Sequence, residues 1–217
     1  MKLPILAPSL FAANFSNLAE AVGQVHAAGA EWVHIDVMDG HFVNGLTFGP
    51  KTVNDLRPLS QNIFDVHLMV AHPENFIEAF AQAGADYITF HIEAALHAQK
   101  LLAFINSLGK KAGICINPST PIIDIEEILP FADLVLVMTV IPGLGGQKLI
   151  PQCLEKVSNL VRLREIRELS FLISVDGGVN TATAALVRDA GADVMVSGEA
   201  FFKSVDKTAL ANLLRGV

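Results

Sequence analysis

Two ionisable side chains share one face of an otherwise apolar segment. In HIDVM, at residues 34–38, His34 and Asp36 alternate with Ile35 and Val37. Residues i and i+2 of a strand point to the same side, and a strand buried on both faces is normally a near-continuous apolar run. Burying an imidazole and a carboxylate together is costly unless a partner compensates them. The pattern predicts that other segments supply this partner.

Two further apolar segments carry ionisable residues in a comparable position. His67 lies in DVHLM, and Asp176 ends the run FLISVD. A lone inward histidine is more often a hydrogen-bonded core residue, and an aspartate before Gly-Gly is often a turn residue. Imidazoles and carboxylates together, however, are suitable ligands for zinc, iron, manganese or cobalt. The four residues therefore favour a site for one divalent metal ion, which would be the missing partner.

Glycine-rich segments follow three apolar runs in the C-terminal half. They read IPGLGG at 141–146, DGGV at 176–179 and SGEAFF at 197–202, the last opening a short helix. Glycines let backbone N–H groups approach an anion, and such loops recur as phosphate sites in barrels of strands and helices. The segments predict a phosphate site formed by Gly143, Leu144, Gly145, Gly146, Gly177, Gly178, Ser197, Gly198 and Glu199.

Three methionines also end apolar runs, namely Met38, Met69 and Met138. Two interpretations stay open for them. Methionine is an adaptable filler of core gaps, and it would also serve as an apolar wall that keeps water from a reactive intermediate.

The elements that would position these residues alternate along the whole chain. Apolar β-branched runs predict strands at residues 5–9, 32–38, 63–69, 86–91, 111–116, 133–139, 171–176 and 193–197. Helical periodicity lies between them, as in Asn17–Ala28 and Pro73–Ala83. The segments AAGAEW, QAGADY and DAGADV each place a glycine where a helix should end before a strand.

Eight strand–helix units indicate a single (β/α)8 barrel domain over residues 1–217, with catalytic groups at the C-terminal ends of its strands. A doubly wound open sheet is the alternative. It normally has a glycine-rich turn after the first strand, where this chain has Pro8-Ser9-Leu10.

Composition narrows the functional classes. The chain is 52% hydrophobic with a net charge of −7, which argues against a nucleic-acid or anionic membrane surface. Its two cysteines, Cys115 and Cys153, have no metal or redox spacing, which favours free thiols in a reducing compartment. No signal-peptide pattern or long apolar run is present. We expect a soluble, cytoplasmic protein.

Six segments together resemble the ribulose-phosphate 3-epimerase family. They are APS (7–9), HIDVMDGHFV (34–43), LTFGP (46–50), DVHLMV (65–70), VMTVIPGLGGQ (137–147) and SVDGGV (174–179). The resemblance implies a (β/α)8 barrel that interconverts D-ribulose 5-phosphate and D-xylulose 5-phosphate in the pentose phosphate pathway. It also implies one divalent metal (zinc, iron, manganese or cobalt) and a homo-oligomer.

The resemblance also assigns roles to individual residues. The implied metal ligands are His34, Asp36, His67 and Asp176. Asp36 and Asp176 would also be the acid/base pair, because epimerisation removes a proton from one face of an enediolate and returns one to the other. The implied substrate contacts outside the phosphate loops are Ser9, Met38, His67, Met69, Met138 and Asp176.

The chain departs from the family pattern at several loop positions. Asn44-Gly45 stands in place of Pro-Asn, Ile141 and Leu144 in place of Asn and Phe, and Glu199 in place of Ser. A 3-epimerase of a hexulose phosphate such as allulose 6-phosphate stays open, as does a non-catalytic barrel that binds a metal or sugar phosphate. A related decarboxylase is disfavoured because Met38 occupies the place of its lysine.

Overall fold

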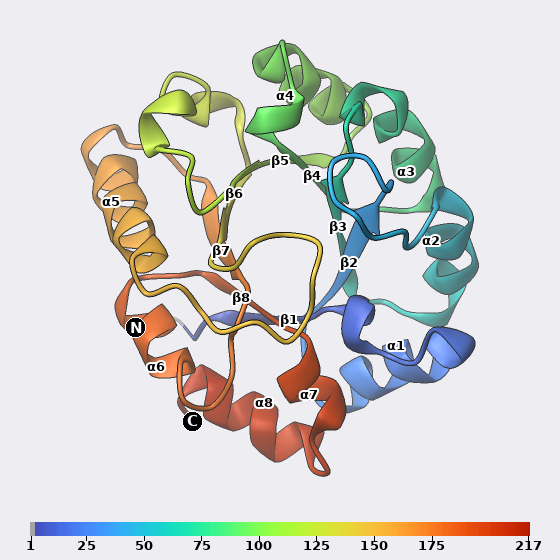
Figure 1. Ribbon diagram of the computed structural model, residues 1–217. Coiled ribbons are helices and arrows are strands. Elements are labelled where there is room, and N and C mark those ends of the chain that lie inside the picture. The colour runs from blue at the N-terminus through green and yellow to red at the C-terminus, as the bar shows by residue number, and fades with distance from the viewer. Residues whose placement is uncertain (1–2) are drawn as a thin grey trace.

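Eight parallel strands form the centre of the computed structural model, which describes residues 3–217 (Figure 1). They are β1 (Ile5–Pro8), β2 (Trp32–Met38), β3 (Ile63–Met69), β4 (Tyr87–His91), β5 (Lys111–Ile116), β6 (Leu134–Met138), β7 (Leu172–Asp176) and β8 (Val194–Ser197). They pair in the order β1-β8-β7-β6-β5-β4-β3-β2, and a bridge between Ser9 and His34 joins the two ends. The predicted barrel is confirmed. The domain bounds of 1–217 stay a prediction, since residues 1 and 2 lie outside the described range.

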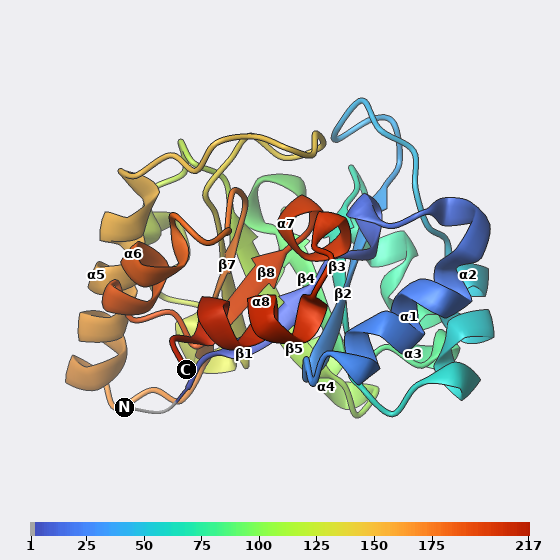
Figure 2. The same cartoon turned by 90° about the horizontal axis from the view of Figure 1, so that it is seen from below.

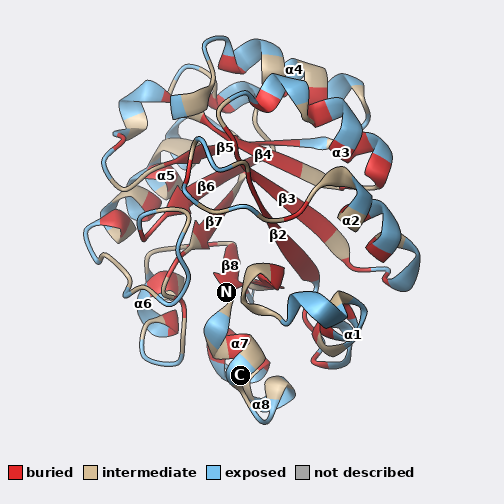
Figure 3. Cartoon of the chain, turned by 45° about the vertical axis from the view of Figure 1, so that its right-hand side comes forward, coloured by how far each residue is buried: buried red, intermediate tan, exposed pale blue. Residues whose placement is uncertain are grey.

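Helices surround the barrel (Figures 1 and 2). They are α1 (Leu18–Ala27), α2 (Pro50–Leu56), α3 (Ile77–Ala83), α4 (Ala98–Ser107), α5 (Cys153–Ile166), α6 (Ala184–Asp189), α7 (Glu199–Lys203) and α8 (Lys207–Arg215). Their apolar faces pack inward while their outer faces are exposed (Figure 3). In residues 3–217, no helix has the length and apolarity that crossing a membrane requires.

Helix α1 illustrates how local sequence sets an element. The side chain of Asn17 caps it by accepting a hydrogen bond from the backbone N–H of Glu20. Val22 and Val25 lie three residues apart and are both fully buried against the barrel, as a helical repeat requires. Gly29 follows with a φ of +70°, a conformation that glycine adopts at little cost. The predicted helix end is confirmed here.

Two helical segments differ from the sequence prediction. The stretch Pro73–Ala83 is divided into a 3-10 turn, η4 (Pro73–Asn75), and α3 from Ile77 onward. Between β5 and β6 the chain forms only two 3-10 turns, η6 (Ile122–Asp124) and η7 (Leu129–Phe131). Three prolines in residues 117–133 account for the missing α-helix, because proline lacks an N–H and disfavours helical geometry in the preceding residue.

Candidate active site

The barrel brings the four predicted metal ligands together. His34 and Asp36 come from β2, His67 from β3 and Asp176 from the end of β7. Each offers one ligand atom, and these atoms all lie within 4.8 Å of one another. The pairing of β2 with β3 places Asp36 opposite His67, so the inward face of one strand continues on the next.

The imidazoles of His34 and His67 both lie beside the carboxylates of Asp36 and Asp176. His34 Nε2 lies 3.3 Å from Asp36 Oδ1, and His67 Nδ1 lies 3.1 Å from the same oxygen. Both nitrogens lie 3.9 Å from Asp176 Oδ2. His34 and His67 are fully buried, while Asp176 keeps 17% of its side chain exposed. The cluster is closed from below and accessible from one side.

The donor set fits a divalent cation. His34 Nε2 is buried and has no hydrogen-bond partner within the described residues, although two carboxylates lie beside it. Its other nitrogen, Nδ1, lies 2.7 Å from Asp65 Oδ2. An ionised carboxylate only accepts hydrogen bonds, so the Nδ1–H of His34 donates to Asp65, and Nε2, which faces the cluster, is the nitrogen that could bind a cation. Two nitrogen and two oxygen ligands suit zinc, iron, manganese or cobalt.

The electrostatic surroundings push the two acid/base candidates in opposite directions. Burial and the nearby charge of Asp36 raise the pKa of Asp176 to about 7. Burial also opposes ionisation of Asp36, but the adjacent imidazoles of His34 and His67 outweigh it and hold the pKa of Asp36 well below its usual range. Two carboxyl groups whose pKa values differ in this way can act as base and acid in one site at neutral pH.

A cavity of about 250 Å³ opens above the cluster. Asp36 and Asp176 line it together with Ser9, whose hydroxyl donates to Asp36 Oδ2. Met38, Met69 and Met138 form buried parts of its wall. Both interpretations of these methionines, core packing and exclusion of water, are compatible with this position.

The predicted phosphate loops form the other side of the cavity. Glycines of all three segments line it, whereas Ser197 is buried behind the wall and donates to the carbonyl of Val179. His67 is likewise buried beneath the cavity. Gly178 has a φ of +69°, and a Cβ at this position would lie 2.3 Å from the backbone nitrogen of Leu149. Glycine at 178 thus lets the loop after β6 pack on the loop after β7.

The loop after β6 crosses over the open end of the barrel (Figures 1 and 2). A Cβ at Gly143 would lie 2.7 Å from the side chain of Val43, so the loops after β6 and β2 touch at this point. Ile141 and Leu144 in this cover are mostly exposed. The departures at these positions therefore alter the outer cover of the cavity and leave the carboxylates in place.

Glu199 lies at the rim of the cavity. Its carboxylate is 45% exposed and forms an ion pair with Lys203 Nζ at 2.7 Å, one helical turn later. A Cβ built at Gly146 would lie 2.8 Å from Glu199 Oε1. The side chain thus lies between α7 and the loop after β6, with its charge compensated by a neighbour.

Sequence reasoning missed three residues near the cluster: the buried Asp65 and His91, and Glu93, whose side chain is 24% exposed. Asp65 lies directly opposite His34 in the pairing of β2 with β3. It precedes His67 by two residues, so the alternation that selected His34 and Asp36 selects it too. His91 ends β4 as a fully buried residue and contacts His67. Its position at the end of a predicted strand was the signal by which the sequence could have identified it as a site residue.

Comparison with known proteins identifies the family of the chain. A model described as the ribulose-phosphate 3 epimerase family matches residues 5–202. The ribulose-phosphate 3-epimerase of Treponema pallidum is 54% identical over 205 residues, which cover 94% of each chain. That of Synechocystis sp. is 46% identical over 202 residues, covering 92% of this chain and 88% of the relative.

The fold has solved counterparts as well. The crystal structure of KGPDC from Streptococcus mutans has a TM-score of 0.72 and 18% sequence identity, covering 99% of this chain and 97% of that one. At this identity the likeness concerns the fold alone.

A (β/α)8 barrel with two carboxylates and two imidazoles at the C-terminal ends of its strands has the architecture of a barrel enzyme, with groups suited to proton transfer. Within the class of barrel enzymes, the chain belongs to the ribulose-phosphate 3 epimerase family. The resemblance noted in the sequence is confirmed, and the chain is an isomerase of the epimerase type.

Proposed function

We propose that this protein interconverts D-ribulose 5-phosphate and D-xylulose 5-phosphate by exchanging the proton at carbon 3. The observation that carries the proposal is the pairing of Asp36 and Asp176 in one cavity, with the pKa of Asp176 raised to about 7 and that of Asp36 lowered. Membership of the epimerase family supports the choice of reaction.

The two carboxylates carry out the proton transfers. One removes the proton from carbon 3, which leaves a planar enediolate, and the other returns a proton to the opposite face. Since the reaction runs both ways, each aspartate is base in one direction and acid in the other. Ser9 donates a hydrogen bond to Asp36 and thereby holds that carboxylate in position.

The cluster of His34, Asp36, His67 and Asp176 would hold one divalent metal ion. Bound there, the ion would supply Lewis-acid stabilisation of the negative charge that develops on the substrate oxygens. The cavity walls formed by Met38, Met69 and Met138 limit access of water to the intermediate.

The glycine loops would bind the phosphate group of the substrate. Gly177, Gly178 and Gly198 line the cavity beside Asp176, and backbone N–H groups of such loops suit an anion. We also propose a homo-oligomer, in keeping with the family resemblance.

A coupled assay tests the proposed reaction. Purified protein should convert ribulose 5-phosphate to xylulose 5-phosphate, and the product is measured with an enzyme that consumes only xylulose 5-phosphate. Allulose 6-phosphate, assayed in parallel, tests the hexulose alternative. A higher kcat/KM for the hexulose phosphate would overturn the pentulose assignment, and absence of turnover with both substrates would favour the non-catalytic barrel.

Replacing Glu199 by serine should affect substrate affinity moderately. The carboxylate is paired with Lys203 and half exposed, so its repulsion of a substrate phosphate is screened. We expect Glu199→Ser to lower KM for ribulose 5-phosphate by at most ~10-fold, about 1.4 kcal/mol, with kcat nearly unchanged.

Steady-state kinetics at several substrate concentrations measure this effect. Glu155→Ser is a matched control, because Glu155 is an exposed glutamate in the first turn of α5. KM should not change in the control. A fall in KM well beyond tenfold for Glu199→Ser would mean that the carboxylate faces the bound phosphate directly.

A further inference from the structure

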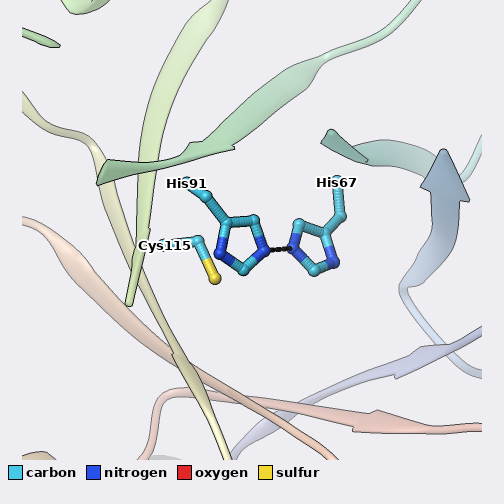
Figure 4. Close-up of side chains that lie close together, drawn as sticks. All are labelled: His67, His91 and Cys115. Carbon is cyan, nitrogen blue, oxygen red and sulfur yellow. Dashed lines mark hydrogen bonds between the residues drawn. The ribbon is translucent and has the colours of Figure 1, made fainter. Parts of the chain in front are cut away.

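A buried histidine outside the metal-ligand cluster contacts one of its members. His91, the last residue of β4, is fully buried. Its Nε2 lies 2.9 Å from Nε2 of His67 (Figure 4). His67 meets the two carboxylates through its other nitrogen, Nδ1. The acid/base chemistry described above makes no use of His91.

Glu93 holds the far side of the His91 ring. Its Oε2 lies 3.2 Å from His91 Nδ1, while its Oε1 accepts hydrogen bonds from the backbone N–H of Asn117, at 2.8 Å, and from the hydroxyl of Thr120. Burial opposes ionisation of Glu93, but these three donors outweigh it and lower its pKa to about 2. Glu93 is therefore an acceptor on both oxygens at neutral pH.

These contacts determine which nitrogens carry protons when both rings are neutral. Because Glu93 only accepts, His91 carries its proton on Nδ1, and its Nε2 is a lone pair. His67 can then donate its Nε2–H to His91, which frees the Nδ1 lone pair beside Asp36 and Asp176 for a cation. Without a cation, Nδ1 is at hydrogen-bond distance from Asp36 Oδ1, 3.1 Å away.

We propose that Glu93 and His91 form a positioning relay that holds His67 as the Nε2–H tautomer and thereby presents its Nδ1 to a divalent cation. The inference rests on the proposed metal binding. Hydrogen-bonded partners of this kind orient metal-bound histidines and raise their basicity. Asp65 orients His34 in the same way, by accepting a hydrogen bond from its Nδ1–H.

The same side chains offer a competing arrangement. Atoms of His67, His91 and Cys115 lie within 4.8 Å of one another and would themselves suit a metal ion. Two observations disfavour it. The Nε2 atoms of His67 and His91 are at hydrogen-bond distance, and burial raises the pKa of the Cys115 thiol, whereas a metal ligand must be the thiolate. The relay therefore predicts one bound ion per chain instead of two.

Zinc affinity, measured by competition with a chromogenic chelator, tests the relay. His91→Phe removes the acceptor for the His67 Nε2–H and should weaken zinc binding by ~10- to 100-fold. Glu93→Gln should weaken it by ~10-fold, since an amide cannot accept on both ends. His72→Phe is the matched control, because His72 is 72% exposed and lies outside the cluster. Its zinc affinity should stay close to that of the parent.

Nuclear magnetic resonance of the zinc-loaded parent protein gives a second measurement that requires no variant. Nitrogen-15 spectra should show His67 protonated on Nε2 and His91 protonated on Nδ1. If His91→Phe lowers the melting temperature of the metal-free protein but binds zinc like the parent, the role of His91 is purely structural and the relay is overturned. Spectra of the parent with the protons on the opposite nitrogens would overturn it too. Two bound zinc ions, or none, would also overturn it.

These outcomes separate the relay from the proposed reaction. Zinc binding that depends on His91, in a protein without epimerase activity, would contradict only the proposed function. An active epimerase in which His91→Phe binds zinc like the parent would contradict only the relay.

Discussion

Replacing Asp36 or Asp176 by asparagine should lower kcat for ribulose 5-phosphate by at least ~10²-fold in each case, the effect typical of a positioned acid or base. An amide is similar in shape to the carboxyl group but neither accepts nor releases the substrate proton. Each aspartate is needed in both directions of the reaction, as base in one and acid in the other. Loss of either one therefore stops turnover in both directions.

Exchange with solvent deuterium at carbon 3 measures the same step separately from product formation. Asp36→Asn and Asp176→Asn each leave one face of the substrate without its proton-transfer group, so deuterated product should not accumulate. Zinc content must be measured for both variants, because both residues are also proposed ligands. Asp55→Asn is the control, since Asp55 is an exposed carboxylate in a surface ion pair with Lys51. A variant at position 36 or 176 with parental turnover would exclude that residue from proton transfer.

Much of the barrel could be predicted because each strand is a short run with little local ambiguity. The bounds 32–38, 63–69 and 111–116 agree with β2, β3 and β5 residue for residue. The structure of the crossover between β5 and β6 was harder to predict from the sequence. Its prolines exclude a regular helix, while the apolar residues Ile122, Ile125 and Leu129 still pack on the core as a helix would.

The site was predictable to the extent that it depends on alternation along a strand. That rule places His34 and Asp36 on one face, and strand ends select His67 and Asp176. Partners across strands depend on register, which the sequence of a single strand does not contain. Alternation with His67 places Asp65 on the inward face, but its position opposite His34 depends on this register. His91 also ends a strand, but a lone inward histidine is more often a hydrogen-bonded core residue, and for this reason it was missed.

Glu199 shows how a local signal was available but not used. The sequence alone allows two orientations of its carboxylate, outward from the helix or toward the substrate phosphate. The structure places it at the cavity rim and pairs it with Lys203. Glutamate and lysine four residues apart in a helix commonly interact, so the spacing alone indicated a third arrangement.

Removing the metal should abolish turnover and destabilise the fold. Burial and the charge of Asp36 raise the pKa of Asp176 to about 7, which reflects two buried carboxylates in one small site. A divalent cation would compensate both charges and would lie where His34 Nε2 points, a nitrogen without a hydrogen-bond partner in residues 3–217. Since the ion binds only the folded state, a concentration of 100 times Kd should stabilise the protein by ~2.7 kcal/mol.

Elemental analysis of freshly purified protein should give one equivalent of zinc, iron, manganese or cobalt per chain. Exhaustive chelation should lower both activity and melting temperature, and adding back one of these ions should restore both. His34→Gln should lose the metal, whereas His72→Gln should keep it, because His72 is 72% exposed and lies outside the cluster. Full activity in chelated protein with no residual metal would show that the two aspartates work without an ion. The buried Nε2 of His34, which has no hydrogen-bond partner in residues 3–217, would then need another explanation.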